Sequence, residues 1–168
     1  MTESFNWREH LNHCMAQTQY CCLATNGTNG VWSSPVYFAW DGFFNIYFIS
    51  QLHSRHMKDI LMNPQISISI YSTQQDTFGD VIGIQLCGSA SILTLPEEIE
   101  IARKIYAGRR YAGKEKRSID EDQYITDPGW HFVKVAPLEM FYFDTRFFGE
   151  MRAAVPKEIL VKQGWFSF

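Results

Sequence analysis

The stretch Tyr47–Pro64, YFISQLHSRHMKDILMNP, decides the expected fold. Its first residues are aromatic and β-branched, which favours a strand, and a short polar turn follows. Ser54–His56 then opens a helix that ends at Asn63, because the proline that follows cannot continue it. The first backbone N–H groups of a helix lack internal partners, and an arginine there offers a planar fork of donors. This strand–turn–helix unit therefore predicts a phosphate site at the helix start.

Short strands joined by tight turns are predicted on both sides of this unit. Before it, the sequence favours a helix over residues 4–18 and strands over 19–25, 31–40 and 43–50. After it, isoleucines alternate with polar residues from 66 to 71 and again from 82, with Gly88 as the site of a bulge. A helix over 94–106, a strand or strand pair over 130–144 and a short helix over 156–163 follow. Sequential hairpins favour an antiparallel sheet, and closure of five or six strands into a small barrel removes its edges.

Composition indicates one soluble domain over residues 1–168. Hydrophobic residues make up 46% of the chain and charged residues 20%, as in a globular protein. We expect a cytoplasmic protein, since the first residues do not resemble a signal peptide and the four cysteines form no C-x-x-C pair. A net charge of −3 gives no reason to expect nucleic acid or a membrane as a partner.

The order of motifs resembles the FMN-binding split-barrel family related to pyridoxamine 5′-phosphate oxidase, and within it the YhbP-like proteins. The family has a strand ending F-Y-T-N, then S-R-K at a helix start, then N-P; here these are 47–50, 54–56 and 63–64. A later strand, 83–88, is similar to the central strand of the family and continues as Gly88-Ser89-Ala90, its Gly-x-Ala. The resemblance covers roughly residues 5 to 145. It implies a mainly β fold with flanking helices, a six-stranded antiparallel split β-barrel of the FMN-binding type.

The resemblance also implies a homodimer with FMN at the interface and a small-molecule substrate. Ser54 and Arg55 would hold the FMN phosphate, with His56 in the place of the usual lysine. The cofactor-binding residues implied in this way are Ser33, Ser34, Pro35, Val36, Ile49, Ser50, Ser54, Arg55, His56 and Gln85.

Two departures change the expected activity. Serines stand at 33 and 34 where the family often has an arginine, and the Arg-x-His substrate motif near the end of true pyridoxamine-phosphate oxidases is not visible. We therefore expect an FMN-dependent oxidoreductase with an unknown substrate other than pyridoxamine phosphate, and no catalytic residue is assigned. The alternatives are a flavin- or haem-binding sensor or storage protein without turnover, a barrel kept as a dimeric interaction module, and the deazaflavin F420 in place of FMN.

Three other patterns have simpler interpretations. His10, His13 and Cys14 have metal-compatible spacing on one predicted helix, but no second cluster completes a site, so no metal is predicted. His131 would be the haem ligand of the haem alternative, although an ordinary strand histidine is the simpler interpretation. The basic stretch Arg103–Arg117 suits a solvated helix end better than a surface that attracts anions or nucleic acid.

Overall fold

The strands of the computed structural model, which describes residues 5–72, 80–110 and 127–161, form one antiparallel sheet. Six strands are long: β1 (Tyr20–Gly27), β2 (Gly30–Tyr37), β4 (Ile46–Gln51), β5 (Gln65–Tyr71), β6 (Ile82–Ile92) and β7 (Trp130–Asp144). Two are short: β3 (Ala39–Trp40) and β8 (Arg152–Ala154). The order across the sheet is β2-β1-β5-β6-β7-β4-β3, with β8 paired to β7.

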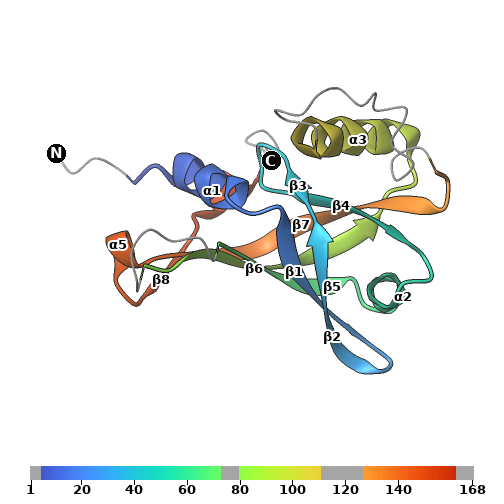
Figure 1. Ribbon diagram of the computed structural model, residues 1–168, viewed down its shortest axis with the longest axis horizontal. Helices are drawn as coiled ribbons and strands as arrows, with labels where there is room; N and C mark the ends of the chain where they lie inside the picture. The colour runs from blue at the N-terminus through green and yellow to red at the C-terminus, as the bar shows by residue number, and fades with distance from the viewer. Residues whose placement is uncertain (1–4, 73–79, 111–126, 162–168) are drawn as a thin grey trace, which may run out of the picture.

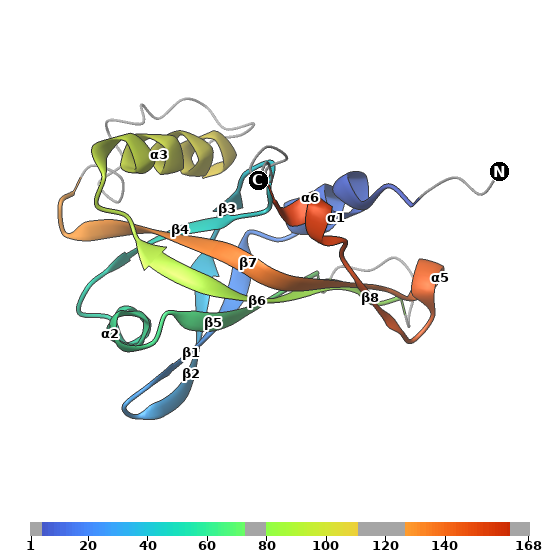
Figure 2. The ribbon, with the colours of Figure 1, turned by 180° about the vertical axis from the view of Figure 1, so that it is seen from behind.

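The sheet curls into a half-barrel with helices around it (Figures 1 and 2). The helices are α1 (Trp7–Ala16), α2 (Arg55–Met62), α3 (Pro96–Arg110), α5 (Thr145–Phe148) and α6 (Lys157–Leu160). The expected mainly β architecture with flanking helices is confirmed, and the six long strands match the six that the sequence predicted. None of the described helices is long and apolar enough to cross a membrane.

Two hydrophobic clusters hold these layers together. The larger fills the inside of the curled sheet, where α1 contributes Leu11, Cys14 and Met15. The smaller lies between α3 and the outer face of β4 and β7, around Tyr106 and Phe132. Alternation along each strand decides which side chains enter which cluster, because successive residues point to opposite faces.

The glycine inside β6 sits at the predicted bulge. The register between β6 and β7 shifts between Cys87 and Gly88. A Cβ atom at Gly88 would lie 2.6 Å from the carbonyl oxygen of Ala136 and 3.0 Å from Cγ1 of Val135. Close approach of two backbones at a bulge thus explains the glycine.

Arg109, at the end of α3, is turned inward. Its guanidinium donates to the backbone carbonyls of Met15 at 2.8 Å, Thr18 and Phe38, and it lies 4.4 Å from the Trp40 ring centroid. Arg109 therefore joins α3 to the end of α1, to the turn before β1 and to the residue after β2, and it is not part of an exposed basic surface. The rest of the basic stretch, from residue 111 on, lies outside the described residues.

Candidate functional site

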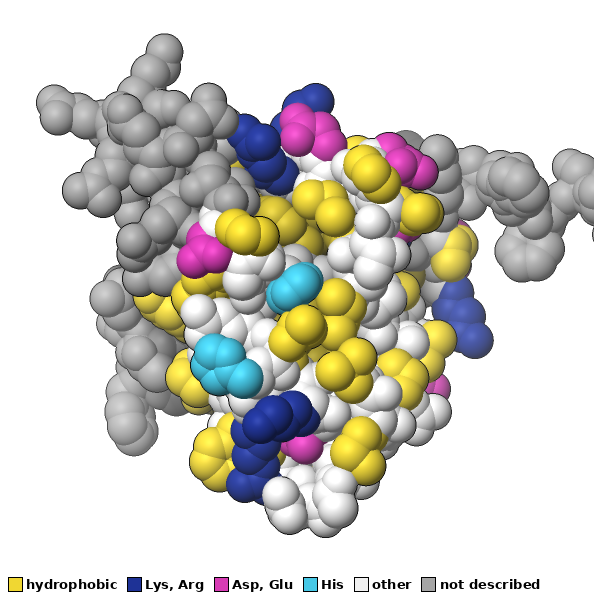
Figure 3. Space-filling view, turned by 90° about the vertical axis from the view of Figure 1, so that its right-hand side faces the viewer, with side chains coloured by type: hydrophobic (Ala, Val, Ile, Leu, Met, Phe, Trp, Pro, Cys, Tyr) yellow, Lys and Arg dark blue, Asp and Glu magenta, His cyan; other side chains and the backbone are white. Residues whose placement is uncertain are grey.

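The predicted phosphate site lies where β4 leads into α2. Ser54 is the residue before the helix, with an extended backbone at φ −64° and ψ 152°. Its hydroxyl makes no capping hydrogen bond to the helix, so it leaves the first N–H groups of α2 to another acceptor. This end of the molecule shows histidine and basic side chains beside hydrophobic ones (Figure 3).

Ser50, Ser54 and His56 meet in one hydrogen-bonded cluster. Nε2 of His56 lies 2.7 Å from Oγ of Ser50 and 3.3 Å from Oγ of Ser54, and the two hydroxyl oxygens are 3.2 Å apart. Burial lowers the pKa of His56, while the charge of Asp59 acts in the opposite direction. A lowered pKa makes the imidazole neutral near pH 7, so His56 supplies hydrogen bonds rather than positive charge.

Arg55 carries the positive charge of the site, and the hairpin between β1 and β2 positions it. Its Nη2 donates to the Asn29 carbonyl oxygen at 2.9 Å, and its guanidinium carbon lies 4.3 Å from the centroid of the Trp32 ring. Nε of Arg55 is buried and has no hydrogen-bond partner among the described residues. A buried N–H without an acceptor is costly, and a bound oxyanion would satisfy it.

Asp59 anchors α2 against β1 beneath this cluster. The carboxylate is 5% exposed and accepts a 2.8 Å hydrogen bond from Oγ1 of Thr25. The end of β1 approaches it so closely that a Cβ atom on Gly27 would lie 2.0 Å from its Oδ1. The start of α2 is therefore held in place by contacts that depend on a buried acid and a glycine.

The four residues predicted on β2 alternate between its two faces. Ser34 and Val36 are buried, with Val36 in the main cluster, while Ser33 and Pro35 are exposed on the outer face. Oγ of Ser33 lies 2.9 Å from Sγ of Cys22. Since β2 is the last strand at one end of the sheet, the edge away from β1 has no partner strand among the described residues. Backbone groups on that edge are the ones that a ligand would reach.

Ile49 and Gln85 do not join the cluster around Ser50. Ile49 is half-buried on the other face of β4, against the cluster beneath α3. Gln85 pairs with Phe141 on β7, whereas Ser50 pairs with His131 on the same strand. These two positions of β7 are ten residues apart, which is about 30 Å of strand. Within one chain, Gln85 is therefore remote from the start of α2.

Sequence reasoning missed three residues that shape the site. Trp32, Asn29 and Asp59 fix the position of Arg55 and of α2. An acid on the apolar face of the predicted helix was the one available signal, because a buried carboxylate needs a partner. The contacts of Trp32 and Asn29 depend on tertiary structure and have no local pattern.

Asp144 and Arg146 lie in the segment that stands where the family has its substrate motif, and these two residues contact each other. Arg146 donates from Nε and Nη2 to both carboxylate oxygens of Asp144, at 2.9 and 2.8 Å. Burial alone would raise the pKa of Asp144, but hydrogen bonds from Arg146 and Tyr142 outweigh it and hold that pKa below its usual range. Arg146 is thus engaged by Asp144.

Comparison with solved structures shows the same fold. A conserved hypothetical protein of Mycobacterium tuberculosis superposes with a TM-score of 0.68 at 17% identity, over 87% of this chain and 89% of the other. A haem-binding protein of Mycobacterium smegmatis gives 0.70 at 17%, over 94% and 61%. HutZ, the haem storage protein of Vibrio cholerae, gives 0.61 at 16%, over 82% and 94%.

The sequence itself matches a family model. No curated protein matches this chain. The model described as pyridoxamine 5′-phosphate oxidase matches residues 8–144, which include every strand from β1 to β7 and the whole α2 site. This chain belongs to the pyridoxamine 5′-phosphate oxidase family.

Proposed function

We propose that this chain binds FMN, with the phosphate at the start of α2, and acts as an FMN-dependent oxidoreductase. The observation that carries the proposal is the buried, unpartnered Nε of Arg55 beside uncapped helix N–H groups. A phosphate oxygen would satisfy these donors, and the helix dipole would add to the attraction. A bound flavin supplies electron or hydride transfer; the protein binds and orients it.

The donors at the start of α2 would hold a phosphate with one positive charge and several neutral hydrogen bonds. Arg55 would provide the cationic contact and Ser54 a hydroxyl, while neutral His56 would donate or accept a hydrogen bond through the Ser50 cluster. The edge of β2 away from β1, from Ser33 to Val36, would offer backbone groups to the ring, and the backbone of Ile49 on β4 would do the same. Membership of this family supports a flavin nucleotide as the molecule that carries the phosphate.

We propose a homodimer that brings Gln85 of the partner subunit to this cofactor. Within one chain, Gln85 lies about 30 Å along β7 from the Ser50 position, so it cannot reach a cofactor anchored at α2. A second copy would also cover apolar side chains that are exposed around α2, namely Leu61 and Met62 at 64% each. Apolar surface of this kind is typical of interfaces.

The substrate would be a small molecule other than pyridoxamine phosphate. Arg146, which falls near the end of the matched segment, is held by Asp144 in a two-bond ion pair and would have to break it to bind a substrate. We propose a cytoplasmic location as well, since Cys14, Cys21, Cys22 and Cys87 are all free thiols.

Haem binding is the second candidate, in a sensor or storage role. The similar folds of the haem-binding protein of M. smegmatis and of HutZ favour it. In this chain His131, half-buried and opposite Ser50 in the β4–β7 register, is the residue on which it would depend. An imidazole is a common axial ligand of haem iron.

The absorption spectrum of the purified protein separates these candidates. FMN predicts the two-band flavin spectrum, quenched flavin fluorescence and an increase in Tm when FMN is added to cofactor-free protein. A Soret band that is lost in His131→Ala would favour haem. Absence of quenching and of any change in Tm at FMN concentrations of tens of micromolar, on the order of 10⁻⁵ M, would refute the flavin proposal.

A further inference from the structure

Three polar side chains at the start of α2 form a continuous chain of hydrogen bonds. Nε2 of His56 lies 2.7 Å from Oγ of Ser50, and that oxygen lies 3.2 Å from Oγ of Ser54. Ser50 is 6% exposed, so water does not readily replace these bonds. Ser54 is the residue before the helix, and its hydroxyl makes no capping bond. The chain therefore runs from a titratable ring to the edge of the proposed phosphate site.

A proton on His56 fixes the direction of these hydrogen bonds. In a neutral imidazole, Nε2 either accepts or donates, depending on the tautomer. Where Nε2 accepts, the hydrogens of both hydroxyls point inward, toward the ring. In the imidazolium, Nε2 can only donate, so Ser50 accepts from the ring and donates its own hydrogen to Ser54. The hydrogen of the Ser54 hydroxyl is then left for an outside acceptor, such as a phosphate oxygen.

Two opposing effects set how readily the ring takes up that proton. Burial lowers the pKa of His56, and the negative charge of Asp59 on the next turn of α2 acts against this effect. The Asp59 carboxylate is itself 5% exposed, so its charge is poorly screened by water. A bound phosphate would bring further negative charge and would raise the pKa of His56 from its lowered value. The free site therefore favours a neutral ring, and the occupied site favours a protonated one.

Few other ionisable groups lie on the elements packed around the ring. They are Arg55, Lys58 and Asp59 on α2, His53 in the turn before it, and His131 on β7. His131 is the partner of Ser50 in the β4–β7 register. The β1–β2 hairpin contacts α2 through Thr25, Asn29 and Trp32, none of which ionises. A proton taken up near neutral pH therefore goes to one of three histidines, of which His56 alone is bonded to Ser54.

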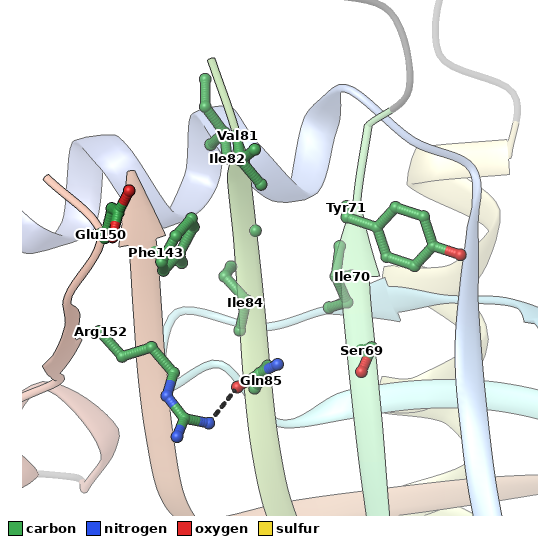
Figure 4. Close-up of a pocket in the computed structure, with 11 residues that line it drawn as sticks. Ser69, Ile70, Tyr71, Val81, Ile82, Ile84, Gln85, Phe143, Glu150 and Arg152 are labelled. Atoms are coloured by element: carbon green, nitrogen blue, oxygen red, sulfur yellow. Dashed lines mark hydrogen bonds between the residues drawn. The ribbon is translucent and has the colours of Figure 1, made fainter. Parts of the chain in front are cut away.

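The proposed dimer adds no further histidine to this set. Gln85 of the partner subunit is the residue expected to approach the cofactor. Figure 4 shows Gln85 on β6 beside Arg152, whose Nη1 donates to its Oε1 at 2.8 Å. None of the described residues that line the pocket around Gln85 is a histidine. Histidine is the side chain that ordinarily changes charge near neutral pH, so the partner does not obscure a titration of His56.

We propose that binding of an oxyanion at the start of α2 is linked to the uptake of one proton by His56, and that Asp59 tunes this uptake. The proton adds a second positive charge beside Arg55 and frees the Ser54 hydroxyl to donate to the ligand. Because the occupied site binds the proton more tightly than the free site, affinity for FMN falls as the pH rises through the neutral range. This linkage rests on the proposed phosphate site, and it gives a histidine the role of the lysine that is usual at this position.

Calorimetric titration of the cofactor-free, full-length protein with FMN counts the protons that are taken up. The titration is run at about pH 7.5 in two phosphate-free buffers of different ionisation enthalpy, where FMN is already mostly a dianion because the second pKa of a phosphate ester is about 6. We expect the wild type to take up about half a proton to one proton per FMN and none with riboflavin. Affinity for FMN should fall about tenfold between about pH 6.5 and 8, while affinity for riboflavin stays constant.

Two variants of His56 separate its charge from its shape. His56→Gln should abolish both the proton uptake and the pH dependence of FMN binding. His56→Lys carries a permanent charge, so at about pH 8 it should bind FMN about tenfold more tightly than the wild type does.

Asp59→Asn tests the tuning of the uptake. It keeps an oxygen for Thr25 but removes the charge, so the fall in FMN affinity should move to lower pH. A merely structural role of Asp59 would instead weaken binding equally at every pH.

His53→Gln is the matched control, because it removes an exposed histidine from the turn before α2 and should leave the proton uptake unchanged. Far-UV circular dichroism and Tm of each variant check the fold. Inorganic sulfate, a dianion throughout this range, is a probe without a flavin. It should raise the Tm of the wild type more at about pH 6.5 than at about pH 8, and this difference should be absent in His56→Gln.

The results that would overturn the proton linkage differ from those that would overturn the flavin proposal. If FMN binds better than riboflavin but without proton uptake, or if His56→Gln retains the uptake, the linkage is wrong and the phosphate site stands. If FMN does not bind at all, the flavin proposal is wrong and sulfate decides. An equal response of the wild type and His56→Gln to sulfate at both pH values would then overturn the linkage as well.

Discussion

At the scale of single residues, the site depends on how one arginine is held. Arg55 stacks on Trp32 and bonds to Asn29 before any ligand arrives, so its guanidinium is already ordered. Because this side chain is ordered before binding, less conformational entropy is lost when a phosphate binds. Trp32 is therefore a positioning residue for the proposed phosphate contact.

Trp32→Ala should weaken FMN binding about three- to tenfold, the size of an exposed cation–π contact. Riboflavin, which has no phosphate, should bind equally well to both proteins. Val31→Ala, a change of the exposed neighbour on the same strand, serves as the control. Equal losses for FMN and riboflavin in Trp32→Ala would show that Trp32 contacts the ring or supports the fold instead.

His56 predicts a specific dependence of stability on pH. Burial lowers its pKa in the folded state, so below about pH 6.5, the pKa of an ordinary histidine, the unfolded chain binds more protons than the folded one. Unfolding free energy should therefore fall as pH drops from about 7 to 5, by at most about 1.4 kcal/mol per pH unit from this residue.

Urea unfolding of the wild type and of His56→Gln between pH 5 and 8 measures this effect. As the pH falls toward 5, the wild type should lose more stability than His56→Gln does. A difference that is independent of pH would mean that His56 titrates normally in the folded protein.

At the scale of elements, replacing Gly88 or Gly108 by alanine should change the stability of the protein in opposite directions. Gly88→Ala places a methyl group 2.6 Å from the Ala136 carbonyl oxygen at the β6–β7 bulge, so it should lower stability by about 1–3 kcal/mol. Gly108 lies inside α3, and no described residue outside its own stretch of helix comes within 4 Å of the new methyl group, so Gly108→Ala should raise stability by about 0.5–1 kcal/mol. Chemical unfolding of both variants tests the pair; similar effects would contradict the packing described here.

The elements were largely predictable because local patterns determine them. Strict alternation located β5 and β6, and the region 130–144, predicted as one strand or a strand pair, is the single strand β7. The observed elements differ from the predicted ones where tertiary contacts determine where an element ends. The predicted strand over 31–40 is divided at Phe38, because the residues before it pair with β1 and the residues after it pair with β4. The predicted helix over 94–106 extends to Arg110, since Arg109 finds carbonyl acceptors on another segment.

The candidate site was predictable as a motif but not as a geometry. The order of Ser54, Arg55 and His56 indicated a phosphate site, and the structure brings Ser50, Ser54 and His56 together. The neutral state of His56 follows from its burial, and the position of Arg55 follows from a hairpin more than twenty residues earlier in the chain. Neither has a signal in the local sequence.

At the scale of the whole molecule, the proposed dimer makes a complementation test possible. A mixed dimer of Arg55→Ala and Gln85→Ala chains would contain one site with both changes and one site with neither, if Gln85 acts across the interface. Mixing the two variants under conditions of subunit exchange should therefore restore flavin binding at one of the two sites of every mixed dimer. If mass spectrometry shows that the subunits exchange and flavin binding is still not restored, Arg55 and Gln85 do not act together in one site.

The central claim is that the start of α2 binds the phosphate of FMN, and the ratio of the affinities for FMN and riboflavin tests it most directly. Both are measured by fluorescence quenching with the wild type and with Arg55→Ala. Loss of a charge-assisted contact should weaken FMN binding about 10- to 100-fold and leave riboflavin within about twofold. If the wild type binds FMN no better than riboflavin, or if Arg55→Ala changes both affinities equally, the phosphate does not lie at α2 and the account is wrong.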